Sequence, residues 1–300
     1  MRHAGNFSLF VAAALVLAGC SGKAPADPEP AAAVAMAEPN PGERLDAVLA
    51  AQPEADRARY AWRHPKQTLE FFGIVPGLTV VDTLPGDAWY TGILLDYLGA
   101  GGKVIGASYS PEMWTKFGEF SPDPKETATW PADFVAKWQG RRGADDAAVA
   151  AMQYGSVPPE VAGTVDVVLM VRAIHHFMRL EGSDGYLTQA LADVNAMLKP
   201  GGIVGVVAHR APESSSDAWA VGEAGYVKQS AVIAAFQKAG FELVEASEIN
   251  ANPQDRPTEK DVVWRLPPTL ATSEKDPELK AKMQAIGESD RMTLKFRKPS

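Results

Sequence analysis

Residues 80–91 read VVDTLPGDAWYT, and this stretch decides which fold the rest of the chain must fit. An apolar strand ends at Asp82, a loop with one glycine follows, and apolar residues then recur at helical spacing from 88 to 99. A strand, a tight turn and a helix in this order direct backbone N–H groups at a ligand. The stretch therefore predicts a ligand-binding turn after the first strand of a sheet.

On both sides of this stretch the sequence alternates between strand-like and helix-like segments, which predicts an α/β domain with a mainly parallel sheet. We expect the helices at 43–52, 64–73, 88–99, 183–202 and 230–241. Apolar runs predict strands at 78–84, 101–109, 147–155, 164–173, 201–210, 241–249 and 291–299, the last two closing the sheet. The polar, proline-rich segment 250–290 predicts little regular structure.

Residues 110–144 interrupt this alternation with four prolines and six aromatic residues. One interpretation is an insertion that packs over the sheet edge as a lid. The alternative is an ordinary surface segment anchored by its aromatic side chains.

The first residues resemble a bacterial lipoprotein signal. A basic start and an apolar run too short to cross a bilayer end in LAGC, so we expect a signal peptide over 1–20 and lipidation at Cys20, the single cysteine. Ser21 then favours the outer membrane facing the periplasm, and the Ala/Pro-rich residues 21–42 form a tether. The folded domain is expected over 43–300. A plain secretory signal is the alternative.

The net charge of −8, from 29 basic and 37 acidic residues, argues against a nucleic-acid partner. Three histidines and an acid could bind a metal ion, and a metal-dependent hydrolase is one hypothesis. Because no HxH or HExxH spacing is present, we predict no metal site.

Histidine and arginine gather at the ends of two predicted strands. The fourth strand ends at Arg172, just before His175 and His176, and the fifth ends at His209 and Arg210. Ligands bind beyond the carboxyl ends of strands in such sheets. Successive strand residues alternate faces, so one of the second pair should face the cleft. Neighbouring residues at a helix start point about 100° apart, so one histidine of the first pair should pack away from it.

Taken together, these motifs resemble the class I S-adenosylmethionine-dependent methyltransferases, and more narrowly a bacterial group of secreted methyltransferases. The resemblance spans residues 57–299 and implies a Rossmann-like, doubly wound sheet of seven mostly parallel strands with an antiparallel closing strand. The motifs that carry it are Arg63-His64-Pro65, Phe71-Phe72-Gly73, Pro85 to Thr91, Arg172 with His175, Ala208 to Ala211, Glu223-Ala224, YVKQSAVIAAFQKAGF, Asn252-Pro253 and LKFRKP.

The resemblance implies S-adenosyl-L-methionine as the cofactor and a small molecule or an envelope component as the methyl acceptor. The implied catalytic residues are His175 as the base, with Arg172, His209 and Arg210 orienting an acidic or polar acceptor. The implied cofactor residues are Asp82, Pro85, Gly86, Asp87, Ala88, Trp89, Tyr90 and Ser108.

The sequence departs from the family at this cofactor site. The class I loop is acid-x-Gly-x-Gly-x-Gly, whereas only Gly86 of the three glycines is kept here. Asp87 would repel the carboxylate of the cofactor, and the second strand offers Ser108 in place of an acid for the ribose. Ala208 replaces the family's aspartate before His209. A non-catalytic, ligand-binding lipoprotein with a degenerate methyltransferase fold is therefore the alternative hypothesis.

Overall fold

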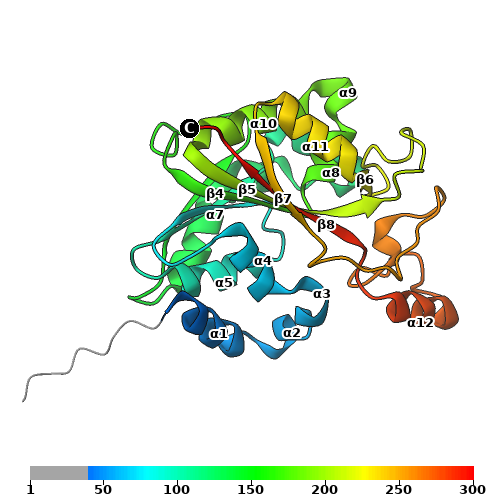
Figure 1. Cartoon of the computed structure of the whole chain (residues 1–300), viewed down its shortest axis with the longest axis horizontal. Helices are drawn as coiled ribbons and strands as arrows, with labels where there is room; N and C mark the ends of the chain where they lie inside the picture. Colours follow the sequence, from blue (N-terminus) through cyan, green and yellow to red (C-terminus); the bar gives the residue numbers. More distant parts are fainter. Residues whose placement is uncertain (1–39) are drawn as a thin grey trace, which may run out of the picture. The chain divides into compact units, whose positions relative to one another are not determined.

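The computed structural model describes residues 40–300, and a mostly parallel sheet runs through this part of the chain (Figure 1). Strands β1 to β5 run parallel to one another, while β8 is antiparallel to both β5 and β7. The order is β3 (Ala148–Gln153), β2 (Lys103–Ser108), β1 (Thr79–Thr83), β4 (Val165–Val171), β5 (Leu198–Ala211), β8 (Arg291–Arg297) and β7 (Glu242–Ser247), with β6 (Val227–Lys228) beside the end of β5.

This order confirms the predicted fold class, with one refinement. The antiparallel strand β8 inserts between β5 and β7 and does not form the edge of the sheet. The strand order reverses between β1 and β4, because β2 and β3 lie on one side of β1 while β4 and β5 lie on the other. In open α/β sheets such a reversal creates the crevice in which ligands bind.

Helices cover both faces of the sheet, because neighbouring strand residues such as Val80 and Val81 belong to different apolar clusters. One face packs against α1 (Pro41–Ala51), α4 (Pro65–Phe72), α5 (Trp89–Leu98) and α7 (Pro124–Arg141). The other packs against α6 (Pro111–Trp114), α8 (Ile174–Arg179), α10 (Tyr186–Met197) and α11 (Gln229–Lys238). The shorter elements are α2 (Glu54–Arg57), α3 (Tyr60–Arg63), η1 (Thr115–Phe120), α9 (Glu181–Asp184), η2 (Val263–Arg265) and α12 (Pro277–Ile286).

Two strand glycines allow the helices to approach the sheet closely. A Cβ on Gly106 would lie 2.6 Å from the ring of Phe134 in α7, and one on Gly205 would lie 2.7 Å from the ring of Phe72 in α4. Both distances are well below van der Waals contact, so these rings pack directly on backbone.

The segment 110–144 forms the connection from β2 to β3. Its long helix α7 lies against β3 and buries Phe134 and Trp138, as a crossover helix does. Its first part, α6 and η1, carries Trp114 and Phe117 over the other face. Movement of residues 110–144 as a lid stays a prediction.

The segment 250–290 is more ordered than its composition predicts. It contains η2 and the ten-residue helix α12, so the expectation of little regular structure is wrong for these residues. Asp276 begins α12 by accepting a hydrogen bond from the N–H of Leu279.

The predicted signal peptide, Cys20 and most of the predicted tether lie outside the described residues. Helix α1 begins at Pro41, capped by Asn40, which is two residues before the expected start of the domain. Within residues 40–300 no helix combines the length and the apolar character that crossing a membrane requires.

Candidate functional site

The turn after β1 has an unusual backbone. Leu84, Gly86 and Ala88 all have positive φ, at 52°, 58° and 61°, and Ala88 is the N-cap residue of α5. In residues 40–300 the N–H groups of Gly86 and Asp87 donate to no backbone acceptor. The position of a Cβ on Gly86 is open, with Leu84 O the nearest atom at 3.8 Å. The turn can therefore offer two N–H groups to an anionic group at the N-terminus of α5.

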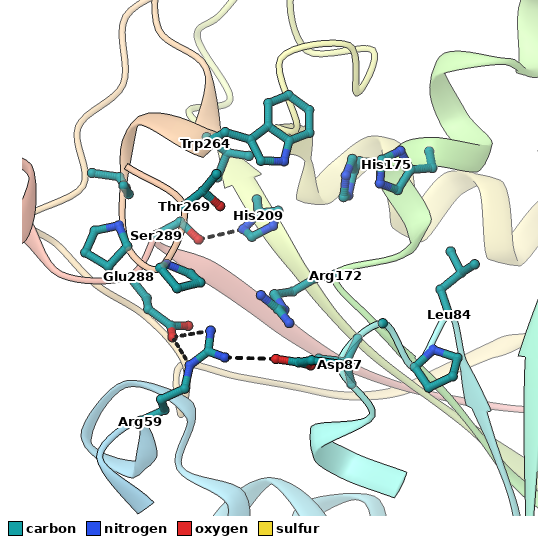
Figure 2. A pocket seen from close by; sticks show the side chains of 18 residues that line it. Arg59, Leu84, Asp87, Arg172, His175, His209, Trp264, Thr269, Glu288 and Ser289 are labelled. Atoms are coloured by element: carbon teal, nitrogen blue, oxygen red, sulfur yellow. Dashed lines mark hydrogen bonds and ion pairs between the residues drawn. The ribbon is translucent and has the colours of Figure 1, made fainter. Parts of the chain in front are cut away.

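A cavity of about 240 Å³ lies beside this turn, at the reversal of strand order between β1 and β4 (Figure 2). Its floor is formed by the ends of β4 and β5, and its opposite wall by segments that are far away in sequence. The lining residues are Arg59, residues 84–87, Val171, Arg172, His175, His176, His209, Val263, Trp264, residues 266–269, Glu288 and Ser289.

Six of the predicted site residues line this cavity: Pro85, Gly86, Asp87, Arg172, His175 and His209. The alternation expected at the end of β5 holds, because Arg210 is not among the lining residues. Its guanidinium binds Asp290 and Glu248, at 2.8 and 2.6 Å.

The other predicted cofactor residues lie away from the cavity. Trp89 packs edge-on against Tyr60, and the guanidinium of Arg63 lies over its ring. Ala88 and Tyr90 are buried in the same apolar cluster as Trp89. The hydroxyl of Ser108 accepts a hydrogen bond from the indole of Trp114, at 3.2 Å.

Asp82 is buried, and its carboxylate binds a side chain of α5. It accepts a hydrogen bond from the hydroxyl of Thr91 at 2.7 Å and is 3% exposed. Burial raises the pKa of this carboxyl to about 6, although the bond from Thr91 lowers it. Asp82 does not line the cavity, so its charge acts on a ligand there only through space.

The histidines occupy distinct environments. The Nδ1 atom of His209 lies 2.6 Å from the hydroxyl of Ser289. His175 is 3% exposed, and in residues 40–300 neither of its ring nitrogens has a hydrogen-bond partner. The ring centroids of His175 and His176 are 3.9 Å apart and both residues line the cavity, so the expectation that one would pack away is wrong.

Burial makes these side chains weak bases. It lowers the pKa of His176 to about 4 and those of His175 and His209 well below 6.5, with nearby arginines acting in the same direction. All three rings are therefore neutral at pH 7. They can donate or accept hydrogen bonds with a ligand without adding positive charge to the cavity.

Sequence reasoning missed a buried ionic cluster on the wall of the cavity. The carboxylate of Glu288 binds Arg59, Arg63 and Arg291 at 3.0–3.1 Å. Arg59 also binds Asp87 at 3.2 Å, which connects the cluster to the turn after β1 (Figure 2). Arg63 belongs to the Arg63-His64-Pro65 motif, but no motif links it to Arg59, Glu288 and Arg291, because the cluster is brought together from distant segments.

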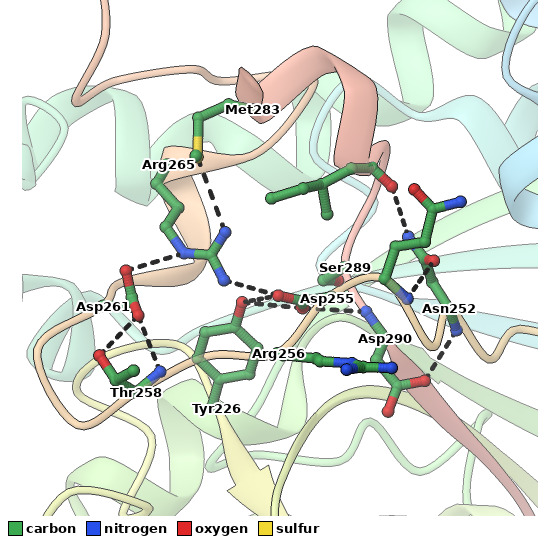
Figure 3. Close-up of polar contacts among 12 residues, drawn as sticks. Tyr226, Asn252, Asp255, Arg256, Thr258, Asp261, Arg265, Met283, Ser289 and Asp290 are labelled. Atoms are coloured by element: carbon green, nitrogen blue, oxygen red, sulfur yellow. Dashed lines mark hydrogen bonds and ion pairs between the residues drawn. The ribbon is translucent and has the colours of Figure 1, made fainter. Parts of the chain in front are cut away.

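The segment 250–290 covers the cavity and is held by buried polar contacts (Figure 3). Asp255 accepts hydrogen bonds from the hydroxyl of Tyr226 at 2.9 Å, from Arg265 at 2.6 Å and from the N–H of Asp290 at 3.0 Å. The amide of Asn252 donates to the carbonyls of residues 286 and 288. These bonds fix both ends of the cover, on which Trp264 and residues 266–269 face the cavity.

An aromatic cluster closes the site on the side of β2. The ring of Tyr109 stacks on Phe117 at 5.4 Å and meets Trp114, His176 and Phe177 edge-on. Beyond it a second cavity of about 320 Å³ lies at the ends of β2 and β3, lined by residues 110–112 and 153–156. In residues 40–300 no group of three or more potential metal ligands comes together.

No protein-family model and no curated protein matches the chain. Solved structures with a similar fold include the cyclase SpnF, 16% identical over 80% of this chain and 81% of that chain, with a TM-score of 0.49. They also include an S-adenosylmethionine-dependent methyltransferase from Aquifex aeolicus, 17% identical over 69% of this chain and 93% of that one, with a TM-score of 0.45. The arsenic(III) S-adenosylmethionine methyltransferase of Chlamydomonas reinhardtii is 17% identical over 86% and 73%, with a TM-score of 0.43.

These likenesses concern the course of the backbone only, and they include both methyltransferases and a cyclase. The activity of this chain has to be argued from its own cavity and from the side chains that line it.

Proposed function

We propose that the domain is an S-adenosylmethionine-dependent methyltransferase acting on a small acceptor. The observation that carries this proposal is the open turn at Gly86, which lies at the reversal of strand order and has a cavity directly beside it. The ordered set of methyltransferase-like motifs supports the same assignment.

The residues of the turn fit the amino-acid end of this cofactor. The N–H groups of Gly86 and Asp87 are available to its carboxylate. The carboxylate of Asp87 already accepts a hydrogen bond from Arg59 through one oxygen, so its other oxygen would accept from the ammonium group. The fit is poorer at the nucleoside end. The cavity beside the turn, at about 240 Å³, is smaller than the roughly 300–1,000 Å³ of most ligand pockets. The second cavity offers Ser110, Glu112 and Gln153 for a sugar and a base. We infer that the ring of Phe117, which packs against Tyr109 and His176, moves aside when the cofactor binds.

In this proposal the protein aligns the acceptor, excludes water and removes a proton. When bound, the cofactor supplies a methyl group on a sulfonium sulfur. Both His175 and His209 are buried and weak bases, but His209 is the better candidate because Ser289 orients its ring, whereas neither nitrogen of His175 has a hydrogen-bond partner in residues 40–300. Trp264 and residues 266–269, which belong to the cover formed by 250–290, keep water from the reacting groups.

Location in the cell envelope belongs to this proposal. The LAGC sequence supports lipidation at Cys20 and a position facing the periplasm. Metabolic labelling with a fatty acid tests this point, and an unlabelled wild-type chain with a labelled control lipoprotein would contradict it.

Calorimetric titration with S-adenosylhomocysteine, the demethylated product, tests the proposed activity. Gly86→Val should weaken binding at least about tenfold, because a β-branched side chain is strained at a φ of 58° and fills the open space. Gly163→Val is the matched control, with a φ of 67° and open space but no place in the cavity. The absence of any heat of binding to the wild-type chain at millimolar ligand would refute the proposal.

A further inference from the structure

Arg172 presents a cation that the protein itself leaves without a partner. It follows β4 directly, and its backbone is held at a φ of 57° with its N–H donating to the carbonyl of Val207. Its side chain is partly buried and lines the cavity, between His209 and Asp87 (Figure 2). In residues 40–300 no carboxylate lies within 4.0 Å of its guanidinium, and Figure 2 draws no bond to it.

The charges around Arg172 do not balance. Arg59, Arg63, Arg172 and Arg291 contribute four guanidinium groups, since arginine keeps its proton in proteins. The carboxyl groups that act on them are Glu288, Asp87 and Asp82. One positive charge is left over at pH 7, and the neutral histidines beside it do not change this count. An unpaired charge in a partly buried position is costly, so one negative charge from a ligand would complete the site.

The wall opposite Arg172 is apolar. Trp264, Leu266, Pro267 and Pro268 line the same cavity, and the ring of Trp264 lies 6.1 Å from that of His175. Flat, rigid side chains of this kind accept a small apolar or aromatic body. The cavity therefore joins a cationic end to an apolar end.

We propose that this cavity binds a small organic acid, with its carboxylate paired to Arg172 and its apolar body against Trp264 and Pro267–Pro268. A carboxylate matches the planar fork of arginine with two parallel hydrogen bonds. Its single charge equals the surplus in the site, whereas a phosphate dianion exceeds it. We also infer that this acid is the methyl acceptor, which rests on the proposed function. The binding of the acid to the cavity does not depend on that function.

Calorimetric titration of the purified full-length chain with benzoate, without any cofactor, tests this inference. Wild-type protein should bind benzoate, and Arg172→Gln should weaken the affinity about ten- to a hundredfold, as expected for the loss of a charged hydrogen-bonded pair. Arg172→Lys should fall between the two. Arg297→Gln, in an exposed pair with Glu242, is the control and should bind as wild type.

Thermal unfolding gives a second readout on the same proteins. Benzoate should raise the melting temperature of wild type and Arg297→Gln, but not that of Arg172→Gln. Since Arg172 has no partner to lose, Arg172→Gln should fold with undiminished stability in the absence of ligand.

Equal benzoate affinity in wild type and Arg172→Gln, or no binding to wild type at millimolar ligand, would overturn the inference. Tighter binding of inorganic phosphate than of benzoate would overturn the choice of a carboxylate. Arg172-dependent benzoate binding in a chain that ignores S-adenosylhomocysteine would leave this inference standing and remove the methyltransferase proposal. A chain that binds S-adenosylhomocysteine but shows no Arg172-dependent binding of benzoate would remove this inference and leave the methyltransferase proposal standing.

Discussion

Glu288 shows at the scale of one residue how the wall of the site is held. Its buried carboxylate is the shared partner of three arginines, two of which, Arg63 and Arg291, are themselves 2–3% exposed. A buried ion pair adds little stability compared with apolar residues, but removing Glu288 leaves Arg63 and Arg291 as buried charges without a carboxylate, while Arg59 keeps Asp87. The position is therefore far less tolerant of change than a surface glutamate.

We expect Glu288→Gln to lower the free energy of unfolding by about 3–5 kcal/mol, because it removes the one charge that the three arginines share. Urea denaturation measures the change. Glu242→Gln removes the same charge from an exposed pair with Arg297 and should cost no more than about 1 kcal/mol. Equal effects of the two substitutions would contradict the description of the cluster as buried and coupled.

The sequence predicted only part of the site at this scale. Arg172, His209 and the turn residues 85–87 could be found because they follow apolar strands, and strand ends meet at one edge of a parallel sheet. Arg59, Glu288, Ser289 and Trp264 could not be found in this way. They lie in connecting segments without periodicity, and only the folded chain brings them together.

Among the elements, the contact between α7 and the sheet shows why β2 contains a glycine. The ring of Phe134 occupies the space in which any other residue at 106 would place its side chain. The connection from β2 to β3 therefore packs as part of the core through its helix, while only α6 and η1 lie over the ends of the strands.

Gly106→Ala should destabilise the protein by about 1–3 kcal/mol, because the added methyl group would overlap the Phe134 ring. Gly140 lies in the last turn of α7, and no atom lies within 4 Å of the position of an added Cβ. Gly140→Ala should therefore stabilise the protein by about 0.5–1 kcal/mol. Chemical denaturation of both variants checks the pair. A harmless Gly106→Ala would mean that α7 does not approach the sheet this closely.

The cover formed by 250–290 is an element that composition predicted poorly. Its polar and proline-rich sequence lacks the apolar periodicity from which helices and strands are predicted. Its order comes from side-chain bonds to distant backbone, chiefly those of Asp255 and Asn252. Such bonds leave no pattern in the sequence.

Asp255→Asn should loosen this cover selectively, because Arg265 would lose a charged partner in a buried position. Hydrogen exchange should rise in residues 250–290 while strands β1, β4 and β5 stay protected. Asp217→Asn, which removes the exposed carboxylate that pairs with Lys228, is the control. Equal protection of the cover in wild type and Asp255→Asn would show that Asp255 does not hold it.

For the whole molecule, the order of the sheet explains why the site lies where it does. The reversal between β1 and β4 places a turn, two strand ends and the start of α5 around one crevice. The alternating segments predicted a mainly parallel sheet, and the resemblance to class I methyltransferases implied its doubly wound order. The insertion of β8 between β5 and β7 depends on pairing between distant strands, which the pattern does not specify.

The stability of the whole domain should fall on acidification below pH 6.5. The four histidines at 64, 175, 176 and 209 have pKa values lowered mainly by burial, so unfolding takes up protons between those values and 6.5. Asp82 acts in the opposite direction. Its pKa is raised to about 6 in the folded protein, so unfolding releases about one proton from this carboxyl below that pH. The free energy of unfolding should therefore level off above about pH 7.5, one unit above the histidine pKa of the unfolded chain, and decrease from there towards pH 5.

Urea denaturation at a series of pH values measures this slope. His176→Gln should flatten it by up to about 1.4 kcal/mol per pH unit, the value for one proton, without changing stability at pH 7.5. Unchanged stability of wild type between pH 7 and 5 would mean that the histidines are not buried as described.

A crystal structure of the domain with S-adenosylhomocysteine is the sharpest test of the methyltransferase proposal. We expect the amino-acid end of the ligand on the N–H groups of Gly86 and Asp87, with the ring of Phe117 displaced from Tyr109 and the nucleoside towards Ser110 and Gln153. Arg172 should remain free for the acceptor. A ligand bound elsewhere, or crystals that take up no ligand while the Tyr109–Phe117 stack stays closed, would contradict it.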